Sequence, residues 1–430
     1  MALMLKGARV VDPQVGLDDN VDLIIDNGKI EKVGKNLDGE ACEVVDVSGK
    51  TLVPGLVDAH VHLREPGFEY KEDIESGTRA AAAGGFTQIC AMPNTDPCVD
   101  DAVGVEYVSA ISRERGKCKV SVSGACTKER QGEILSDMGN MFAHGVRMFT
   151  DDGQGVQKAG IMRLVMDYAS QFDCVVATHA QDDSLVGDGQ VNEGVISTRL
   201  GLTSWPAEGE EIIIERDISL CRLTGCPLHI QHVTTKRGLS LIKRAKEEGL
   251  PVTCEVTPHH MFFCEDDIDD MYPTNLKVNP PLRTKEDADA LIQGVKDGTV
   301  DIIVTDHAPH AIYEKDREFE LAPFGMCGLE TSLGAVLTNL VTNNEIGLSR
   351  LVELMAVNPR KILRLEPVEL REGSIADITI FDDHKKWVAG ESGWQSKSGI
   401  YGFEGCEFIG KPTDVLVDGE FVFKDEKIVG

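Results

Sequence analysis

The sequence predicts an α/β protein in which a (β/α)8 barrel, the TIM-barrel architecture, carries a small β-sandwich formed by the N- and C-terminal segments. In the middle of the chain, apolar β-rich runs alternate with helix-like segments, a pattern typical of repeated βα units with a parallel sheet. Both ends lack helical periodicity and contain short alternating strands. We therefore expect two domains, a barrel over 55–365 and a sandwich over 1–54 and 366–430.

The two ends of the chain share one texture. Residues 5–53 form short candidate strands separated by turns such as Asp26-Asn27-Gly28 and Ser48-Gly49. Similar strands return over 375–381 and 414–423. We expect these segments to pair with each other in the small sandwich.

Eight candidate strands lie between the ends, with helix-like segments such as 73–83, 210–223 and 239–248 in the gaps. An open doubly wound sheet more often has fewer strands and a glycine-rich phosphate turn, so the pattern favours a closed barrel. The predicted strands cover approximately 55–62, 86–94, 119–127, 146–152, 174–180, 228–234, 252–260 and 301–307.

Composition limits the classes of function. The net charge of −29 disfavours binding to nucleic acid or to anionic membranes, and no apolar run reaches the roughly 18 residues of a membrane span. The first residues lack the features of a secretory signal, and the twelve cysteines are scattered without a CxxC pair. We expect a soluble, cytoplasmic protein without structural disulfides that acts on a small molecule.

Polar groups follow several of the predicted strands. In a (β/α)8 barrel the functional residues come from the C-terminal ends of the strands, so these groups should meet at one mouth. A single histidine at a strand end is more often structural, but five such ends with imidazole or carboxylate favour a site for zinc or a similar divalent ion. The ends in question are His60-Val-His62, Asp151-Asp152, His179, His232 and Asp306-His307.

Six sequence motifs occur in the same order as in one known family. They are Val57-Asp-Ala-His-Val-His-Leu-Arg64, Met92-Pro-Asn94, Met148-Phe-Thr-Asp-Asp-Gly153, Val278-Asn-Pro-Pro-Leu-Arg283, Thr305-Asp-His-Ala-Pro-His310 and Pro323-Phe-Gly325. Over nearly its whole length the chain resembles the amidohydrolase superfamily and, within it, the class I dihydroorotases. This resemblance implies reversible interconversion of L-dihydroorotate and N-carbamoyl-L-aspartate in de novo pyrimidine biosynthesis.

The resemblance also implies a zinc centre with one or two ions per chain. Many relatives bridge the two ions with a carboxylated lysine, but no lysine lies between Arg147 and Gly153. Strand alternation places Asp151 and Asp152 on opposite faces without deciding between them, and the resemblance favours Asp152 as the bridge. The implied ligands are His60, His62 and Asp306 for one ion, His179 and His232 for the other, and Asp152 for both.

Substrate contacts are implied by the same resemblance. Asp306 would act as the catalytic proton shuttle, and an arginine suits a substrate carboxylate because its planar fork offers paired donors. For Arg64 the competing interpretation is a surface ion pair with Glu65 or Glu69, and His259-His260 receive no catalytic role. The implied substrate-binding residues are His62, Arg64, Asn94, Asn279 and His310, with the backbone of Phe324 and Gly325.

Two other functions remain open at this point. A dihydropyrimidinase, hydantoinase or allantoinase shares the barrel and the HxH pair, although such enzymes usually use the lysine bridge. A catalytically inactive scaffold is the second alternative, but such proteins tend to lose ligands. The resemblance further implies a homo-oligomer and allows an association with aspartate transcarbamoylase, for which the sequence offers no interface motif.

Overall fold

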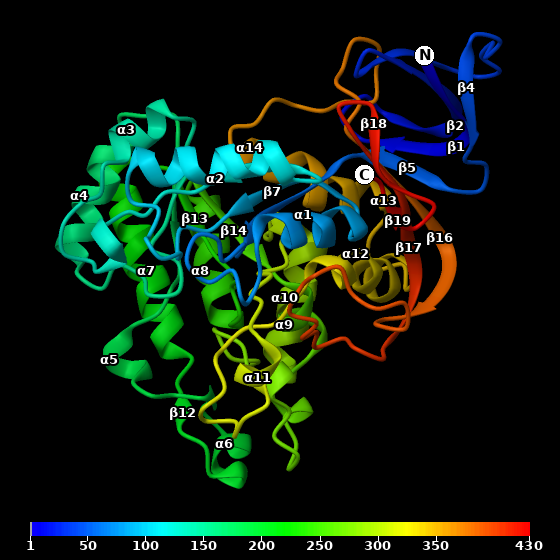
Figure 1. Cartoon of the computed structure of the whole chain (residues 1–430). Coiled ribbons are helices and arrows are strands. Elements are labelled where there is room, and N and C mark those ends of the chain that lie inside the picture. Colours follow the sequence, from blue (N-terminus) through cyan, green and yellow to red (C-terminus); the bar gives the residue numbers. More distant parts are fainter. Residues whose placement is uncertain (1) are drawn as a thin grey trace.

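The computed structural model describes residues 2–430, and Figure 1 shows the whole chain. It contains the expected ring of eight parallel strands. Two parallel bridges, Gly124 with Phe149 and Val61 with His307, connect the two sheets of the ring and close it. One sheet consists of β6 (Leu56–Val61), β7 (Phe86–Ala91) and β8 (Lys119–Val122). The other consists of β9 (Met148–Phe149), β10 (Val175–Thr178), β13 (Leu228–Ile230), β14 (Val252–Val256) and β15 (Ile302–Ile303).

Most of these strands end earlier than the sequence predicts. At the ends of β6, β13 and β15 the backbone leaves the extended conformation, and Arg64, His232 and Asp306 have φ values of 62°, 27° and 46°. Non-glycine residues adopt positive φ only rarely, usually at turns or functional sites. The prediction of one strand over 252–260 is wrong in its second half, because Thr257 caps α9 (Pro258–Phe262) there.

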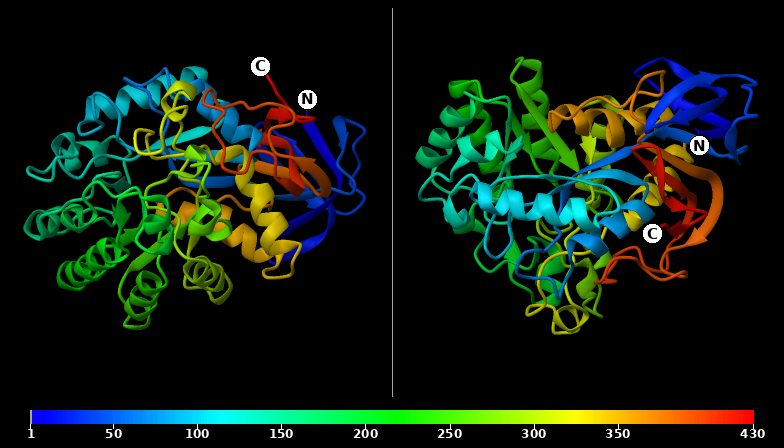
Figure 2. Two further views of the ribbon diagram at one scale, coloured as in Figure 1. Left: turned by 90° about the horizontal axis from the view of Figure 1, so that it is seen from below. Right: turned by 45° about the horizontal axis from the view of Figure 1, so that its top comes forward.

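Helices surround the ring on its outside (Figure 2). The three predicted helix-like segments correspond to α1 (Ile74–Ala83), α7 (Glu208–Thr224) and α8 (Lys236–Glu247). Asp73 caps α1 and accepts a hydrogen bond from the Ser76 amide, which explains where that helix begins. The other helices of the ring include α2 (Ala102–Arg115), α3 (Met138–Ala143), α4 (Ala159–Ala169), α10 (Lys285–Asp297), α12 (Leu329–Val336), α13 (Leu348–Val352) and α14 (Asn358–Ile362).

The two ends of the chain join in one nine-stranded sheet beside the barrel, where the N- and C-termini also lie (Figures 1 and 2). The central contact is antiparallel, with Ile378 opposite Pro54. Fully buried residues such as Leu5, Leu23 and Ile380 form the core of this unit, separate from the barrel core. Its strands are β1 (Ala2–Asp12), β2 (Leu17–Asp26), β3 (Lys29–Gly34), β4 (Cys42–Asp46), β5 (Thr51–Pro54), β16 (Ile378–Val388), β17 (Glu407–Val417), β18 (Glu420–Lys424) and β19 (Lys427–Ile428).

The predicted turn Asp26-Asn27-Gly28 connects β2 to β3, and Asn27 and Gly28 have φ values of 48° and 77°. Two consecutive positive φ angles suit the tight hairpin turns that favour Asn-Gly.

The nine-stranded sheet confirms that the two ends of the chain pair, whereas the residue numbers given for the domain boundaries stay a prediction. Among residues 2–430, no helix has the length and apolar character needed to span a bilayer, and all twelve cysteines are free thiols.

Short elements lie in the long loops that follow the barrel strands. They are α5 (Asp183–Val186), β11 (Val191–Asn192), α6 (Val195–Leu200), β12 (Ser204–Trp205) and α11 (Ile312–Lys315). Because the loops after parallel strands meet at the same end of a barrel, they form the walls of the mouth at which the site residues gather.

Candidate active site

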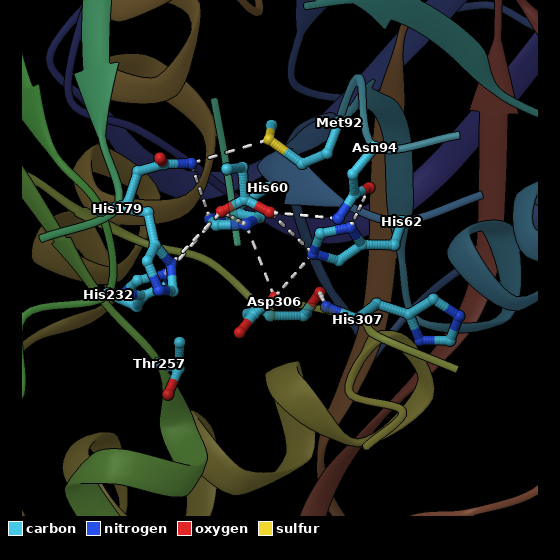
Figure 3. A network of polar contacts seen from close by, with 12 residues as sticks. His60, His62, Met92, Asn94, His179, His232, Thr257, Asp306 and His307 are labelled. Atoms are coloured by element: carbon cyan, nitrogen blue, oxygen red, sulfur yellow. Dashed lines mark hydrogen bonds and ion pairs between the residues drawn. The ribbon is translucent and has the colours of Figure 1, made fainter. Parts of the chain in front are cut away.

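The strand-end residues predicted to bind metal meet in one buried cluster (Figure 3). His60 Nε2 lies 3.2 Å from Asp152 Oδ1, and His62 Nε2 lies 3.4 Å from Asp152 Oδ2. Asp306 Oδ1 is 3.1 Å from His62 Nε2 and 3.5 Å from His60 Nε2. Asp152, which follows β9, and Asp306, which follows β15, therefore face the two imidazoles at the end of β6.

The other half of the cluster consists of His179 and His232. His179 Nδ1 lies 2.9 Å from His232 Nε2 and 3.7 Å from Asp152 Oδ1, while His232 Nε2 is 3.9 Å from the same oxygen. Asp152 thus lies between the two groups of histidines, as a bridging ligand would. Asp151 instead points to Thr127, whose amide donates to Asp151 Oδ1 at 3.0 Å and whose hydroxyl donates to Oδ2.

The donor atoms of the cluster fit metal ions. His60 Nε2 and Asp152 Oδ1 are buried and have no hydrogen-bond partner within residues 2–430. Buried polar atoms normally have partners, so atoms without one at the centre of a site require an explanation such as an ion. Three overlapping groups of His and Asp atoms lie close enough together to hold ions. These buried clusters indicate a binuclear metal site, because imidazole and carboxylate together suit divalent cations.

Hydrogen bonds on the far side of each ring determine which nitrogen faces the centre. His60 Nδ1 donates to Glu255 Oε1 at 2.6 Å, and His62 Nδ1 donates to Asn94 Oδ1 at 2.8 Å. Both bonds leave Nε2 with a free lone pair toward the cluster. His179 is reversed, since its Nε2 donates to Gln181 Oε1 at 3.1 Å and its Nδ1 faces the cluster.

Glu255 is a functional residue that the sequence reasoning missed. Besides His60, this buried carboxylate in β14 accepts from His229 Nε2 at 2.9 Å and from the His232 amide at 3.1 Å. Burial alone raises the pKa of Glu255, but the charge of His60 and the hydrogen bonds from His229 and His60 lower it to about 2. The only signal in the sequence is one glutamate inside the otherwise uncharged strand Val252-Thr-Cys-Glu-Val256.

A cavity of about 330 Å³ opens above the cluster. Every residue of the cluster except His60 lines this cavity, and the residues predicted to bind substrate form its wall. That wall contains Arg64, Asn94, Asn279, His310, Phe324 and Gly325. The structure therefore brings the predicted metal residues and the predicted substrate residues to one cavity, at the end of the barrel where sites normally form.

The guanidinium of Arg64 at this wall has no carboxylate partner in residues 2–430. Its Nε donates to the Pro309 carbonyl at 3.1 Å, and it forms no ion pair with any carboxylate of residues 2–430. Glu65 instead accepts from the Ile74 amide at 3.0 Å, and Glu69 accepts from the Gly67 amide at 2.9 Å. The surface ion pair considered for Arg64 is thus not formed, and the remaining guanidinium nitrogens are available to a ligand.

The remaining wall residues are held by protein contacts. His310 Nε2 donates to the Phe324 carbonyl at 2.8 Å, and its Nδ1 lies 3.3 Å from Lys71 Nζ. Burial, together with the charges of Arg64 and Lys71, lowers the pKa of His310 to about 2, so the ring is neutral. Asn279 donates to Gln181 Oε1 at 3.2 Å, while its own Oδ1 is buried without a partner in residues 2–430.

Three neighbouring histidines do not join the cluster. His307 points away from it (Figure 3), with Nε2 3.3 Å from Glu72 Oε2. His260 is bonded to Thr257 Oγ1 and to the Pro280 carbonyl at 2.8 and 2.9 Å. His259 is buried next to His260 and does not line the cavity, and burial lowers its pKa to about 4.

The sequence matches a family described as Dihydro-orotase-like over residues 49–238. A dihydroorotase from Trichlorobacter lovleyi is 44% identical over 424 residues, which cover 98% of this chain and 99% of that protein. A dihydroorotase from Pelobacter propionicus is 46% identical over 425 residues, covering 99% of this chain and 100% of the relative. Both alignments include the barrel and the terminal sandwich.

Solved structures support the same fold. An L-hydantoinase (dihydropyrimidinase) from Arthrobacter aurescens superposes with a TM-score of 0.89 at 25% identity, covering 100% of this chain and 97% of that one. A D-hydantoinase, at 24% identity and a TM-score of 0.88, shares the architecture. On sequence identity over the full length, supported by this fold and by the buried His/Asp cluster, the chain belongs to the dihydroorotase family of the amidohydrolase superfamily.

Proposed function

We propose that this chain interconverts L-dihydroorotate and N-carbamoyl-L-aspartate at two divalent ions, and that Arg64 selects the substrate by its carboxylate. One observation carries the proposal. An arginine without an ion-pair partner in residues 2–430 shares a cavity of about 330 Å³ with the His/Asp cluster. A cyclic amide bearing a carboxylate satisfies both features at once.

The ligand assignment is the one that the family resemblance implies, and the short distances between these side chains support it. His60, His62 and Asp306 would hold one ion, His179 and His232 the other, and Asp152 would bind both, because its oxygens face both groups of histidines. When bound, two such cations lower the pKa of a shared water and polarise the ring carbonyl of the substrate. We propose zinc as the metal, since imidazole with carboxylate is a ligand set that zinc favours.

Asp306 is our candidate for the proton shuttle. Burial alone raises its pKa, but positive charge at the position of His60 outweighs burial and lowers the pKa of this carboxyl well below its usual range. Because Asp306 lines the cavity, it can take the proton from the attacking water and return it to the ring nitrogen as the amide C–N bond breaks. In the reverse direction it takes a proton from the carbamoyl nitrogen and passes it to the carboxyl oxygen that leaves as the ring closes, and one further proton from solvent makes that oxygen a water molecule.

Substrate orientation is assigned to the wall. Arg64 would form a charge-assisted pair with the carboxylate, and Asn94 and Asn279 would bind polar atoms of the substrate. Asn94 is itself fixed by His62, which makes it a link between the metal ligands and the substrate. A dihydropyrimidinase or hydantoinase has no carboxylate to bind on the ring of its substrate, so it has no use for a free arginine at this position.

The location and the oligomeric state of the enzyme are further proposals. We propose a cytoplasmic homo-oligomer, and an association with aspartate transcarbamoylase is one arrangement to test. The free cysteines support the cytoplasmic location. An inactive scaffold is disfavoured because all six proposed ligands are present and converge.

The deciding experiment is a dihydroorotate hydrolysis assay, run in both directions on protein of known metal content. We expect turnover that needs between one and two divalent ions per chain and that disappears with a chelator. Dihydrouracil and hydantoin should be poor substrates. Metal-loaded protein that hydrolyses hydantoin but not dihydroorotate would favour the hydantoinase alternative, and inactivity in every assay would favour the scaffold.

A further inference from the structure

Two buried lysines lie behind the loop that carries Phe324, outside the proposed catalytic machinery. Lys315, at the end of α11, donates from Nζ to the carbonyls of Pro323 at 2.9 Å and Gly325 at 2.8 Å. A third contact, to the Lys277 carbonyl, measures 3.3 Å. The side chain of Lys315 therefore forms hydrogen bonds with the loop on both sides of Phe324.

Lys277 binds an earlier part of the same loop. Its Nζ donates to the carbonyls of Phe319 at 2.7 Å and Glu320 at 3.1 Å, and lies 4.5 Å from the centre of the Phe324 ring. Its own carbonyl accepts from the Gly325 amide at 2.9 Å. The segment leading to Asn279 and the loop over 311–325 are thus joined by ammonium groups from both sides.

These contacts determine which backbone groups remain for a ligand. The carbonyls on either side of Phe324 are held by Lys315, and the Phe324 carbonyl accepts from His310. The Phe324 amide has no acceptor within residues 2–430, while Phe324 itself lines the cavity. It is the backbone donor that this part of the wall can offer to substrate.

The two lysines are also costly to bury. Neither forms an ion pair with a carboxylate of residues 2–430, and burial lowers the pKa of Lys315 to about 7 and that of Lys277 to about 8. Lysine is almost never fully buried without a charged partner. An ammonium group nevertheless has three donors, which matches the three carbonyls around Lys315.

We propose that Lys315 and Lys277 are positioning residues that set the conformation of loop 323–325 and thereby the affinity for substrate. The inference rests on the proposed function, since it assigns Phe324 to the substrate wall. The competing possibility is that the lysines only contribute to folding. A folding role would change stability and metal content together, whereas a positioning role changes KM with the metals in place.

The test compares Lys315→Met with Arg317→Met, a matched loss of one cation at an exposed position of the same loop. For Lys315→Met we expect KM for dihydroorotate to rise about tenfold or more and kcat to change less than about threefold, because a backbone contact to substrate is lost while the metal cluster is not touched. Hydrogen exchange of 319–326 without ligand should become faster. Arg317→Met should match the parent in all three measurements.

Further variants make the outcome unambiguous. Lys277→Met should resemble Lys315→Met and replaces it if that variant does not fold, whereas Lys315→Arg should restore part of the affinity by supplying donors. Unchanged KM and unchanged exchange in the lysine variants would overturn the proposal, and so would a loss of metal with equal falls in kcat and kcat/KM. If the parent enzyme does not use dihydroorotate, the proposed function fails on its own, and the exchange experiment still tests the loop.

Discussion

The active-site cavity has two sides that are built in different ways. On the metal side, imidazoles and carboxylates follow barrel strands, and acceptors such as Glu255 and Asn94 orient the rings of His60 and His62. On the substrate side, the wall residues lie in loops, and lysine side chains that donate to backbone carbonyls hold these loops, as Lys315 does. The metal side depends on a periodic scaffold, whereas the substrate side depends on contacts between distant loops.

The largest expected effect separates the two adjacent aspartates of the metal side. Asp152→Asn should abolish binding of at least one ion and reduce kcat by about a thousandfold or more, because the oxygens of Asp152 face both groups of histidines. Asp151→Asn should keep the metals and cost about 1–3 kcal/mol of stability through its bonds to Thr127. Metal analysis, kinetics and urea unfolding measure these results, and the opposite pattern would make Asp151 the bridge.

A smaller but more selective effect is expected on the substrate side. Arg64→Met removes one charge-assisted contact of roughly 1.5–3 kcal/mol, so kcat/KM for dihydroorotate should fall about tenfold to a hundredfold or more. Metal content should not change, and any turnover of dihydrouracil should stay as it was, since that compound has no carboxylate. Unchanged dihydroorotate kinetics in a metal-loaded variant would remove the main physical support for the proposed substrate.

The difference between the two sides explains which parts of the fold and the site could be predicted from the sequence. Strands and their ends are visible as apolar runs followed by polar residues, so the barrel, the pairing of the termini and the strand-end groups at His60, Asp151-Asp152 and Asp306 were predictable. Strand alternation alone did not decide between Asp151 and Asp152, and the structure separates them through Thr127, which lies in another loop. That contact has no sequence pattern.

Polar contacts between residues far apart in the chain could not be predicted from the sequence. Glu255 contacts His60 across 195 residues of chain, and Lys277 contacts Phe319 across 42. A glutamate in an apolar strand and a lysine before Asn279 are each compatible with many roles. The strand predicted over 252–260 is too long for a different reason, because Thr257-Pro258, a cap residue followed by proline at the first helical position, was taken as part of an apolar run.

Glu255 offers a way to test whether the orientation of ligands matters as much as the ligands. Glu255→Gln keeps the size of the side chain but cannot accept from both His60 and His229 through a pair of carboxylate oxygens. We expect metal affinity to fall about tenfold to a hundredfold, with KM at saturating metal close to the parent value. Competition with a chelator measures the affinity, and parent-like affinity would restrict Glu255 to a structural role.

The smallest expected effect concerns His310 and the pH dependence of stability. Burial and the charges of Arg64 and Lys71 lower its pKa in the folded protein to about 2, whereas a histidine in an unfolded chain titrates near pH 6.5. As the pH falls below about 6.5, the unfolded chain binds a proton that the folded chain does not, so the free energy of unfolding decreases. By pH 5 this one group accounts for up to about 2 kcal/mol.

His310→Gln removes that group while keeping a neutral side chain that can donate to the Phe324 carbonyl. The parent should therefore lose more stability than the variant between pH 7 and pH 5, by up to about 2 kcal/mol. Urea unfolding at both pH values and at equal metal content gives the comparison, and the absolute stability at pH 7 does not enter it. Equal losses in the two proteins would mean that His310 takes up its proton within the fold. Its ring would then be a cation at the wall beside Arg64, and the substrate side would attract the carboxylate with two charges instead of one.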